Sequence, residues 1–377
     1  MSVEIRKVQT RKELRDFIHF ANDLYKGNKY YAPSLISDDY NTFNPKKNGA
    51  YDFCQAQMFL AYKDGKLAGR VMGIINSRAN ESWKVKQVRY GWIDFINDEE
   101  VAKALLDAVA AWGKERGMTE IAGPLGFTDF DPEGMLVEGF DRLATLPGIY
   151  NYPYYPEIME KLGYKKETDW MEYRITIPDE LPERYYKYAD IVIAKNKLNV
   201  RKVTRRMINK ENYGRKFFKL INETYYKLYG FSLLSDKQID AYTKLYLGLL
   251  DTRMLSFVEN EKGELVAAGV TMPDISEALQ KCNGELFPFG WYHLLKAIFW
   301  KPGDTIDMLL IGVREDYRGK GLNAVIMTDL YPRLKAMGFK YAETTAELET
   351  NDKIQAMWKY FDREQHKRRR VYAKKIE

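Results

Sequence analysis

The order of predicted strands and helices in the first half of this chain is repeated in its second half. Residues 5–8 (IRKV) recur as residues 200–203 (VRKV). Two apolar strands joined by a polar glycine turn are indicated at 58–69 and again at 254–269. An amphipathic helix that stops at a glycine follows in each half, at 101–117 and 322–338, and Pro332 is expected to kink the second one. Such repetition predicts two copies of one unit built from strands and helices.

A basic turn with two close glycines marks the second half. Residues 311–323 (IGVREDYRGKGLN) lie between a strand-like run at 306–313 and a helix-like run at 322–337. Glycines allow a ligand to approach the backbone, and the first N–H groups and the dipole of a helix attract negative charge. Arg318 and Lys320 add positive charge. The turn therefore predicts a site for the phosphates of a nucleotide-bearing cofactor.

Two familiar phosphate-binding patterns fit this turn poorly. The P-loop requires Ser or Thr after its lysine, whereas Gly321 follows Lys320. The dinucleotide-binding pattern matches in spacing at Gly319, Gly321 and Ala324, with Glu343 further on. That motif begins where its strand stops, however, and a charged run intervenes here. It also needs a larger parallel sheet than the remaining chain can supply.

A third pattern matches better. The segment resembles the acyl-CoA loop of the GNAT (Gcn5-related N-acetyltransferase) family, in which Gln or Arg followed by x-x-G-x-G/A cradles the pyrophosphate of coenzyme A. Residues 318–322 match, and Asn323 stands where Gly or Ala is usual. Residues 159–164 (MEKLGY) are similar to a GNAT ending, and 358–361 (WKYF) take the parallel place. The resemblance covers nearly the whole chain.

The resemblance implies an α/β fold, with a mixed sheet, of two tandem GNAT-like acyl-CoA acyltransferase units. We expect an N-terminal GNAT-like domain at 1–178, a linker or helix at 179–197, and a C-terminal GNAT domain at 198–377. In the first half the matching strand, 90–96, runs into an acidic helix start at 97–100 without a glycine loop. Since carboxylates repel a pyrophosphate, the cofactor is expected in the second half only.

GNAT enzymes pass an acyl group from the thioester directly to an acceptor, which is usually an amine. The resemblance therefore implies acetyl-CoA or another acyl-CoA as the cofactor, with its pantetheine arm along the strand that precedes the loop. The residues implied in cofactor binding are Leu310, Ile311, Val313, Arg318, Gly319, Lys320, Gly321, Asn323 and Asn351.

The general acid and base are less clearly marked. The family's usual acid is a Tyr seven residues after an Asn on the last helix, and counting from Asn351 that position is Trp358. Tyr360 is the nearest tyrosine, although it lies on a different helical face. Candidate bases are Asp307, Glu343, Glu347 and Glu349, and the run at 347–351 is the best single cluster.

Two further segments have more than one interpretation. The loop at 123–155 carries five carboxylates that could receive a cationic amine or form an ordinary solvated loop: Asp129, Asp131, Glu133, Glu138 and Asp141. It imitates the start of a calcium loop, but Phe140 stands at the closing Glu position. An aromatic insertion at 287–300 indicates either an acyl chain longer than acetyl or a packed helix.

Composition limits the remaining possibilities. Two distant cysteines and three histidines make a metal site or a histidine-centred triad improbable, and no apolar run reaches membrane-spanning length. The net charge of +6 is mild and does not demand nucleic acid. We expect a cytoplasmic protein with a small-molecule or peptide amine acceptor, and neither nucleic acid nor membrane as partner. The basic segment 367–375 could contact the coenzyme A 3′-phosphate or form a charged edge strand.

Two rival functions remain open on the same double fold. One is aminoacyl transfer from tRNA, as in the Fem-type peptidoglycan transferases, which lack a good pyrophosphate loop. The other is a protein that holds acyl-CoA without turnover, to which Trp358 and Asn323 would be suited. The leading hypothesis is an acyl-CoA-dependent N-acyltransferase.

Overall fold

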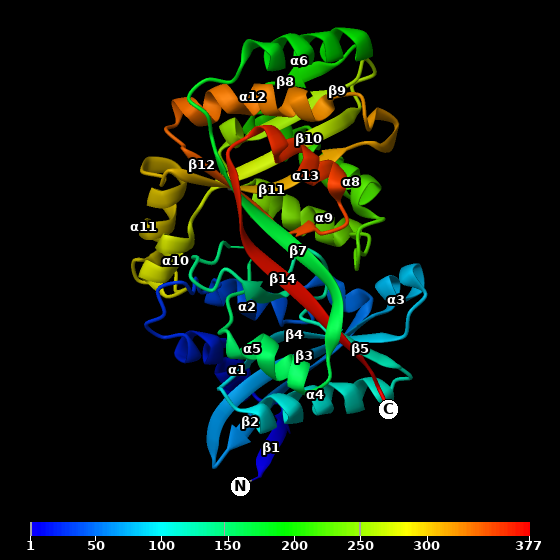
Figure 1. The fold of residues 1–377 in the computed structure, drawn as a ribbon, viewed down its shortest axis with the longest axis vertical. Coiled ribbons are helices and arrows are strands. Elements are labelled where there is room, and N and C mark those ends of the chain that lie inside the picture. The colour runs from blue at the N-terminus through cyan, green and yellow to red at the C-terminus, as the bar shows by residue number, and fades with distance from the viewer. Residues whose placement is uncertain (1, 147, 249) are drawn as a thin grey trace.

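The computed structural model describes residues 2–146, 148–248 and 250–377. Its strands form one mixed sheet that runs along the molecule, with helices packed against it in both halves (Figure 1). None of the helices in these described ranges is long and apolar enough to cross a membrane.

The first half contains the following elements: β1 (Val3–Lys7), α1 (Arg11–Leu24), α2 (Ile36–Thr42), η1 (Gly49–Asp52), β2 (Cys54–Lys63), β3 (Lys66–Asn76), α3 (Ser77–Trp83), β4 (Gln87–Phe95), α4 (Glu99–Lys114), β5 (Glu120–Gly123), β6 (Met135–Glu138), α5 (Tyr154–Lys161) and β7 (Lys165–Thr176).

The second half begins with α6 (Glu183–Asn196) and continues as follows: β8 (Asn199–Arg201), α7 (Arg205–Lys210), α8 (Tyr213–Tyr225), α9 (Asp236–Tyr242), η2 (Thr243–Leu247), η3 (Thr252–Met254), β9 (Leu255–Glu259), β10 (Leu265–Pro273), α10 (Ser276–Cys282), α11 (Gly290–Leu295), η4 (Lys296–Trp300), β11 (Thr305–Val313), η5 (Glu315–Tyr317), α12 (Leu322–Ala336), β12 (Tyr341–Thr344), β13 (Glu347–Leu348), α13 (Asp352–Met357), η6 (Trp358–Tyr360) and β14 (Arg363–Lys375).

The strand order reads the same from both edges of the sheet. It runs β1-β2-β3-β4-β5-β14-β7-β12-β11-β10-β9-β8, so that β1 to β5 correspond to β8 to β12. In each half the first four strands pair antiparallel, and the fifth pairs parallel to the fourth. The expected two-copy architecture is therefore confirmed.

The repeated glycines at the ends of the two hairpins let a helix approach the sheet closely. A Cβ on Gly69 would lie 2.7 Å from Leu105 of α4, and a Cβ on Gly269 would lie 2.6 Å from Ile326 of α12. Side chains from these helices fill the core on that face of each half. In both copies the absence of a side chain at this glycine thus allows a helix to pack closely on the sheet.

The two halves are joined by an exchange of their last strands. β14, from the end of the chain, pairs with β5 of the first half, and β7 pairs with β12 of the second half. The two exchanged strands also pair with each other over most of their length and cross the middle of the molecule (Figure 1). The interpretation of 367–375 as an edge strand is therefore wrong, because β14 has partners on both sides.

The linker region is fixed to the second half. Its helix α6 packs against α12. The hydroxyl of Tyr331 donates to the carbonyl oxygens of Pro178 and Asp179, at 3.0 and 2.9 Å. The helix α12 itself continues through Pro332 from Leu322 to Ala336.

Candidate functional site

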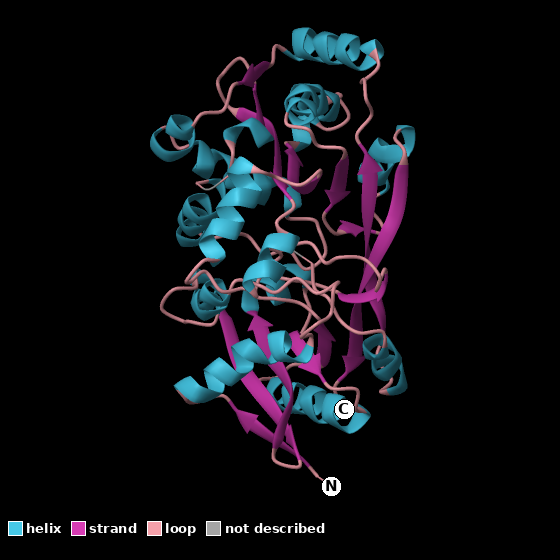
Figure 2. Cartoon of the chain, turned by 90° about the vertical axis from the view of Figure 1, so that its left-hand side faces the viewer, coloured by secondary structure: helices cyan, strands magenta, loops and turns pink. Residues whose placement is uncertain are grey.

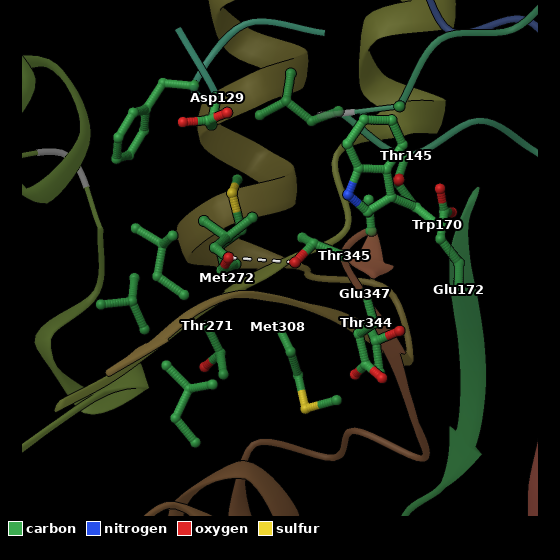
Figure 3. Close-up of a pocket in the computed structure, with 18 of the residues that line it drawn as sticks. Asp129, Thr145, Trp170, Glu172, Thr271, Met272, Met308, Thr344, Thr345 and Glu347 are labelled. Atoms are coloured by element: carbon green, nitrogen blue, oxygen red, sulfur yellow. Dashed lines mark hydrogen bonds between the residues drawn. The ribbon is translucent and has the colours of Figure 1, made fainter. Parts of the chain in front are cut away.

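A cavity of about 1810 Å³ lies where the two halves meet. Most of its wall comes from the second half, from β10, β11, α8, α11 and the start of α12. The first half completes it with residues of α1, the segment 31–42, β3, β4, the loop region 124–151 and β7. Figure 3 shows Glu347 and Thr344 on one side of this space and Asp129 on another. The wall is mainly apolar, so the few polar groups that face it are conspicuous.

One edge of β11 diverges from its neighbour at the cavity. The parallel pairing of β11 with β12 extends only from Thr305 to Met308. After β12 the chain turns away, and β13 pairs with β7 instead. A register shift at Val270 and Thr271 of β10 bends the same part of the sheet. Leu310, Ile311 and Val313 consequently line the cavity. A free strand edge of this kind is what the predicted pairing with a pantetheine arm requires.

The glycine turn places an open helix start beside this edge. Gly321 precedes α12 with φ of +86°, and no side chain caps that helix. In the first half the equivalent helix, α4, is capped by its own Asp98, whose carboxylate accepts from the N–H groups of Glu100 and Val101. Because free N–H groups and a helix dipole attract anions, the start of α12 is suited to an anionic group, whereas the start of α4 already has the Asp98 carboxylate as its cap.

The two basic residues of the turn have different roles. The guanidinium of Arg318 donates to the carbonyl oxygen of Thr224, at 2.7 Å, and so ties the turn to α8. Lys320 extends over the ring of Tyr317, 4.9 Å from its centre, and does not line the cavity. Gly319, Gly321, Asn323 and Asn351 do line it, together with Arg318.

Glu347 is a buried carboxyl group aimed into the cavity. Its Oε1 accepts a hydrogen bond from the indole N–H of Trp358 at 2.8 Å, while Oε2 has no partner among the described residues. Burial raises the pKa of Glu347 to about 7, although the Trp358 bond acts in the opposite direction. Such a group exchanges a proton readily near neutral pH, as a general base must.

The other candidate catalytic residues lie away from the cavity, and Glu343 pairs with Lys367 of β14. Tyr360 is 79% exposed on the outside of the molecule. Glu349 forms an ion pair with Lys166, at 2.6 Å between Oε2 and Nζ. Asp307 is buried outside the lining residues, and its burial together with the charge of nearby carboxylates raises its pKa well above the usual range. Only Glu347 of the proposed bases reaches the cavity.

Tyr225 is a polar group of the site that sequence reasoning missed. Its hydroxyl donates to the carbonyl oxygen of Ile311 at 3.0 Å and accepts from the N–H of the same residue at 3.3 Å. Burial raises the pKa of Tyr225 to about 12, and the charge of Glu347 contributes to this shift. The chain has 28 tyrosines, and no sequence signal distinguishes this one.

The acidic loop of the first half supplies part of the cavity wall. Asp129, Asp131 and Glu133 line the cavity, and burial raises the pKa of each. The remaining two carboxylates lie elsewhere, because Glu138 pairs with Arg368 and Asp141 lies beside Arg142. Three of the five proposed amine-receiving carboxylates are thus brought to the site.

Two curated proteins are similar to almost the whole chain. Protein YghO of Escherichia coli is 28% identical over 99% of this chain and 95% of its own length. The bacterial ceramide synthase of Caulobacter vibrioides is 24% identical over 98% of this chain and 96% of its own length. No protein-family model matches the chain.

Solved structures give the fold. A tandem GNAT protein from the clavulanic acid biosynthesis pathway superimposes with a TM-score of 0.56 and 10% identity, over 100% of this chain and 99% of that one. A GCN5-related N-acetyltransferase from Sphaerobacter thermophilus superimposes with a TM-score of 0.51 and 11% identity, over 99% and 96%. Together with the repeated strand order and the open helix start, these matches identify the protein as a chain with the tandem GNAT fold.

Proposed function

We propose that this protein is an acyl-CoA-dependent N-acyltransferase that joins a long acyl chain to the amine of a long-chain amino alcohol. One observation carries the proposal: a single apolar cavity connects the open start of α12 to a buried carboxyl group with a pKa of about 7. The similarity to a bacterial ceramide synthase supports the choice of substrates, since a ceramide is the amide of a fatty acid and a long-chain amino alcohol.

The residues divide into binding and proton-transfer groups. Gly319, Gly321 and the first N–H groups of α12 hold the pyrophosphate, and the splayed edge at Leu310 and Ile311 holds the pantetheine arm. The apolar wall is assigned to the two long chains of the substrates. The acidic loop of the first half faces the polar end of the acceptor, where carboxylates favour an ammonium group.

The reaction consists of one bond formed and one bond broken. The bound ammonium first gives one proton to water and becomes a neutral amine. Its nitrogen then attacks the thioester carbonyl carbon, and Oε2 of Glu347 takes the second proton that the nitrogen loses. The carbon–sulfur bond then breaks, and the hydroxyl of Tyr225 supplies a proton to the leaving thiolate. Trp358 touches no reacting atom in this scheme and acts as a positioning residue for Glu347.

The bond from Trp358 predicts a pH effect. Its indole N–H stabilises the charged form of Glu347, so Trp358→Phe should raise the pKa of Glu347. We expect the wild-type kcat to rise through about pH 7 as Glu347 loses its proton, and the variant's rise to occur at higher pH. A kcat–pH profile measures this. Tyr360→Phe serves as the control, and equal midpoints in all three proteins would contradict the assigned role.

A side chain in place of Gly321 in the glycine turn should weaken the binding of coenzyme A. A Cβ on Gly321 would lie 2.5 Å from the Tyr188 hydroxyl oxygen and 2.8 Å from a methyl group of Val192, so Gly321→Val crowds the helix start against α6 and strains a backbone with φ of +86°. We expect the Kd for coenzyme A to rise about tenfold or more by calorimetry. Gly338→Val is the matched control, because Gly338 has a similar φ of +88° but no atom within 4 Å of its Cβ position. An equal loss of coenzyme A affinity in both variants would indicate that backbone strain, and not the position of Gly321, causes the effect.

The proposed activity is tested directly with purified protein. Palmitoyl-CoA and sphinganine should give free thiol and an N-acyl product by mass spectrometry, and acetyl-CoA should be a poorer donor. Thioester loss without amide product, or coenzyme A binding with no turnover on any amine, would favour the acyl-CoA-binding alternative. Salt-sensitive binding of tRNA instead of coenzyme A would favour aminoacyl transfer.

A further inference from the structure

An aromatic face lies on the outside of the second half, around α11 and η4. We define it by six side chains that are between 37 and 78% exposed: Phe287, Phe289, Trp291, Tyr292, Phe299 and Trp300. Thirteen large hydrophobic side chains are exposed in the described part of the chain, and these six lie within residues 287–300. Concentrated exposure of this kind marks an interaction surface, because scattered hydrophobic residues are the rule elsewhere.

We propose that the aromatic face docks the protein on the surface of a membrane that contains anionic lipids. Figure 1 places α10 and α11 on one side of the molecule, and the view in Figure 2 faces that side. Tryptophan and other aromatic rings partition favourably into the boundary between headgroups and acyl chains. This proposal revises the expectation from sequence that a membrane is not a partner, since docking needs no spanning helix.

The face is continuous with the cavity. Trp291 and Phe299 are exposed on the surface and also line the cavity, and Leu294, Leu295 and Ile298 line it behind them. An apolar chain could therefore pass from a bilayer into the cavity without crossing water. This role in substrate delivery rests on the proposed function, whereas docking itself does not.

The charged side chains within residues 287–301 are both lysines, while the exposed Glu285 lies two residues before the face. Lys296 and Lys301 lie on the same segment, and Glu277 of α10 is paired with Lys281 at 3.2 Å. The first half adds Lys29, since Gln280 of α10 donates to the carbonyl oxygen of that residue at 2.9 Å. Each lysine close to an anionic surface strengthens attachment. A second copy of the chain is a poorer occupant, because it would cover the mouth of the cavity at Trp291 and Phe299.

Vesicle sedimentation tests the proposal with the full chain. We expect the protein to bind vesicles of phosphatidylethanolamine and phosphatidylglycerol, and to bind pure phosphatidylcholine vesicles more weakly. The variant Phe289→Ser/Trp300→Ser should bind at least about tenfold more weakly, and neither residue lines the cavity. Ile191→Ser/Leu233→Ser is the matched control, because it removes two exposed apolar side chains outside the face and should bind like the wild type.

Three results distinguish the possibilities. Equal vesicle binding by the face variant and the wild type would overturn the proposal. A dimer in sedimentation velocity that the face variant converts to monomer, without any vesicle binding, would overturn it in favour of a second copy. Vesicle binding that the face variant loses supports docking even if no acyl transfer is found. In that case the docking proposal stands and the proposed function fails. Unchanged coenzyme A binding by the face variant shows that it is folded.

Discussion

Glu347→Gln is expected to lower kcat for amide formation by about 10²–10⁴-fold, because the variant keeps the shape of the side chain but cannot take a proton. Gln can still accept the hydrogen bond from Trp358, so its position should be preserved. The affinity for coenzyme A should change little, since Glu347 has no role in the proposed cofactor site. Steady-state kinetics with palmitoyl-CoA and sphinganine at pH 8 measure the effect, and calorimetry measures the affinity.

The neighbouring carboxylate provides the control for this prediction. Glu349 is two residues away but faces Lys166 rather than the cavity, so Glu349→Gln should keep most of the activity. A parallel variant, Tyr225→Phe, removes the hydroxyl proposed to protonate the thiolate and should also slow the reaction. If Glu347→Gln retained wild-type kcat, another group or water would have to serve as the base, and the mechanism proposed here would be wrong.

Glu172→Leu is expected to destabilise the protein by about 3–5 kcal/mol, as is typical when one member of a buried ion pair is removed. Glu172 of β7 is 2% exposed and pairs with Arg369 and Lys367 of β14, both 1% exposed. Replacing the carboxylate leaves two buried cations short of a partner. Since β7 and β14 join the halves, the loss should lower the midpoint of urea unfolding and the Tm.

The same pair predicts an acid effect. The cations hold the pKa of Glu172 at about 2 against a usual 4.5, although burial opposes this. Because the folded-state pKa is lowered, the stabilisation is fully present above about pH 4.5 and is lost as the pH falls toward 2. The difference in free energy of unfolding between Glu172→Leu and the wild type should therefore be largest at neutral pH. Asp107→Ala breaks the exposed ion pair with Lys103 and should change the free energy of unfolding little, because solvent screens such a pair. Equal destabilisation by both variants would contradict this account.

Local patterns predicted much of the architecture. The hairpins, the helices after the fourth strands and the glycine turn are all short segments whose spacing and residue types limit what they can form. The contrast between the acidic start of α4 and the open start of α12 was also visible in sequence, because a capping carboxylate and a glycine turn are both local signals. The role of the glycine turn in cofactor binding stays a prediction.

The basic residues of the last strand show where such patterns fail. Alternating charge predicts an edge strand with one solvated face. The carboxylates that make a central position possible, Asp169, Glu172 and Glu343, lie far away in sequence on β7 and β12. Only the exchange of strands between the halves brings these charges together.

The proposed catalytic cluster depended on tertiary structure for the same reason. Sequence spacing placed Trp358 where the family usually has a tyrosine, which argued against catalysis. In the folded chain the indole of Trp358 donates a hydrogen bond to Glu347, and Tyr360 is exposed to solvent. Tyr225 and the acidic loop reach the cavity from α8 and from the other half of the chain. The sequence by itself determined the repeated units and the half with an open helix start, because both follow from local backbone preferences. The strand exchange, the position of the proposed proton-transfer pair and the cavity wall were decided by contacts between distant segments, which local preferences do not specify.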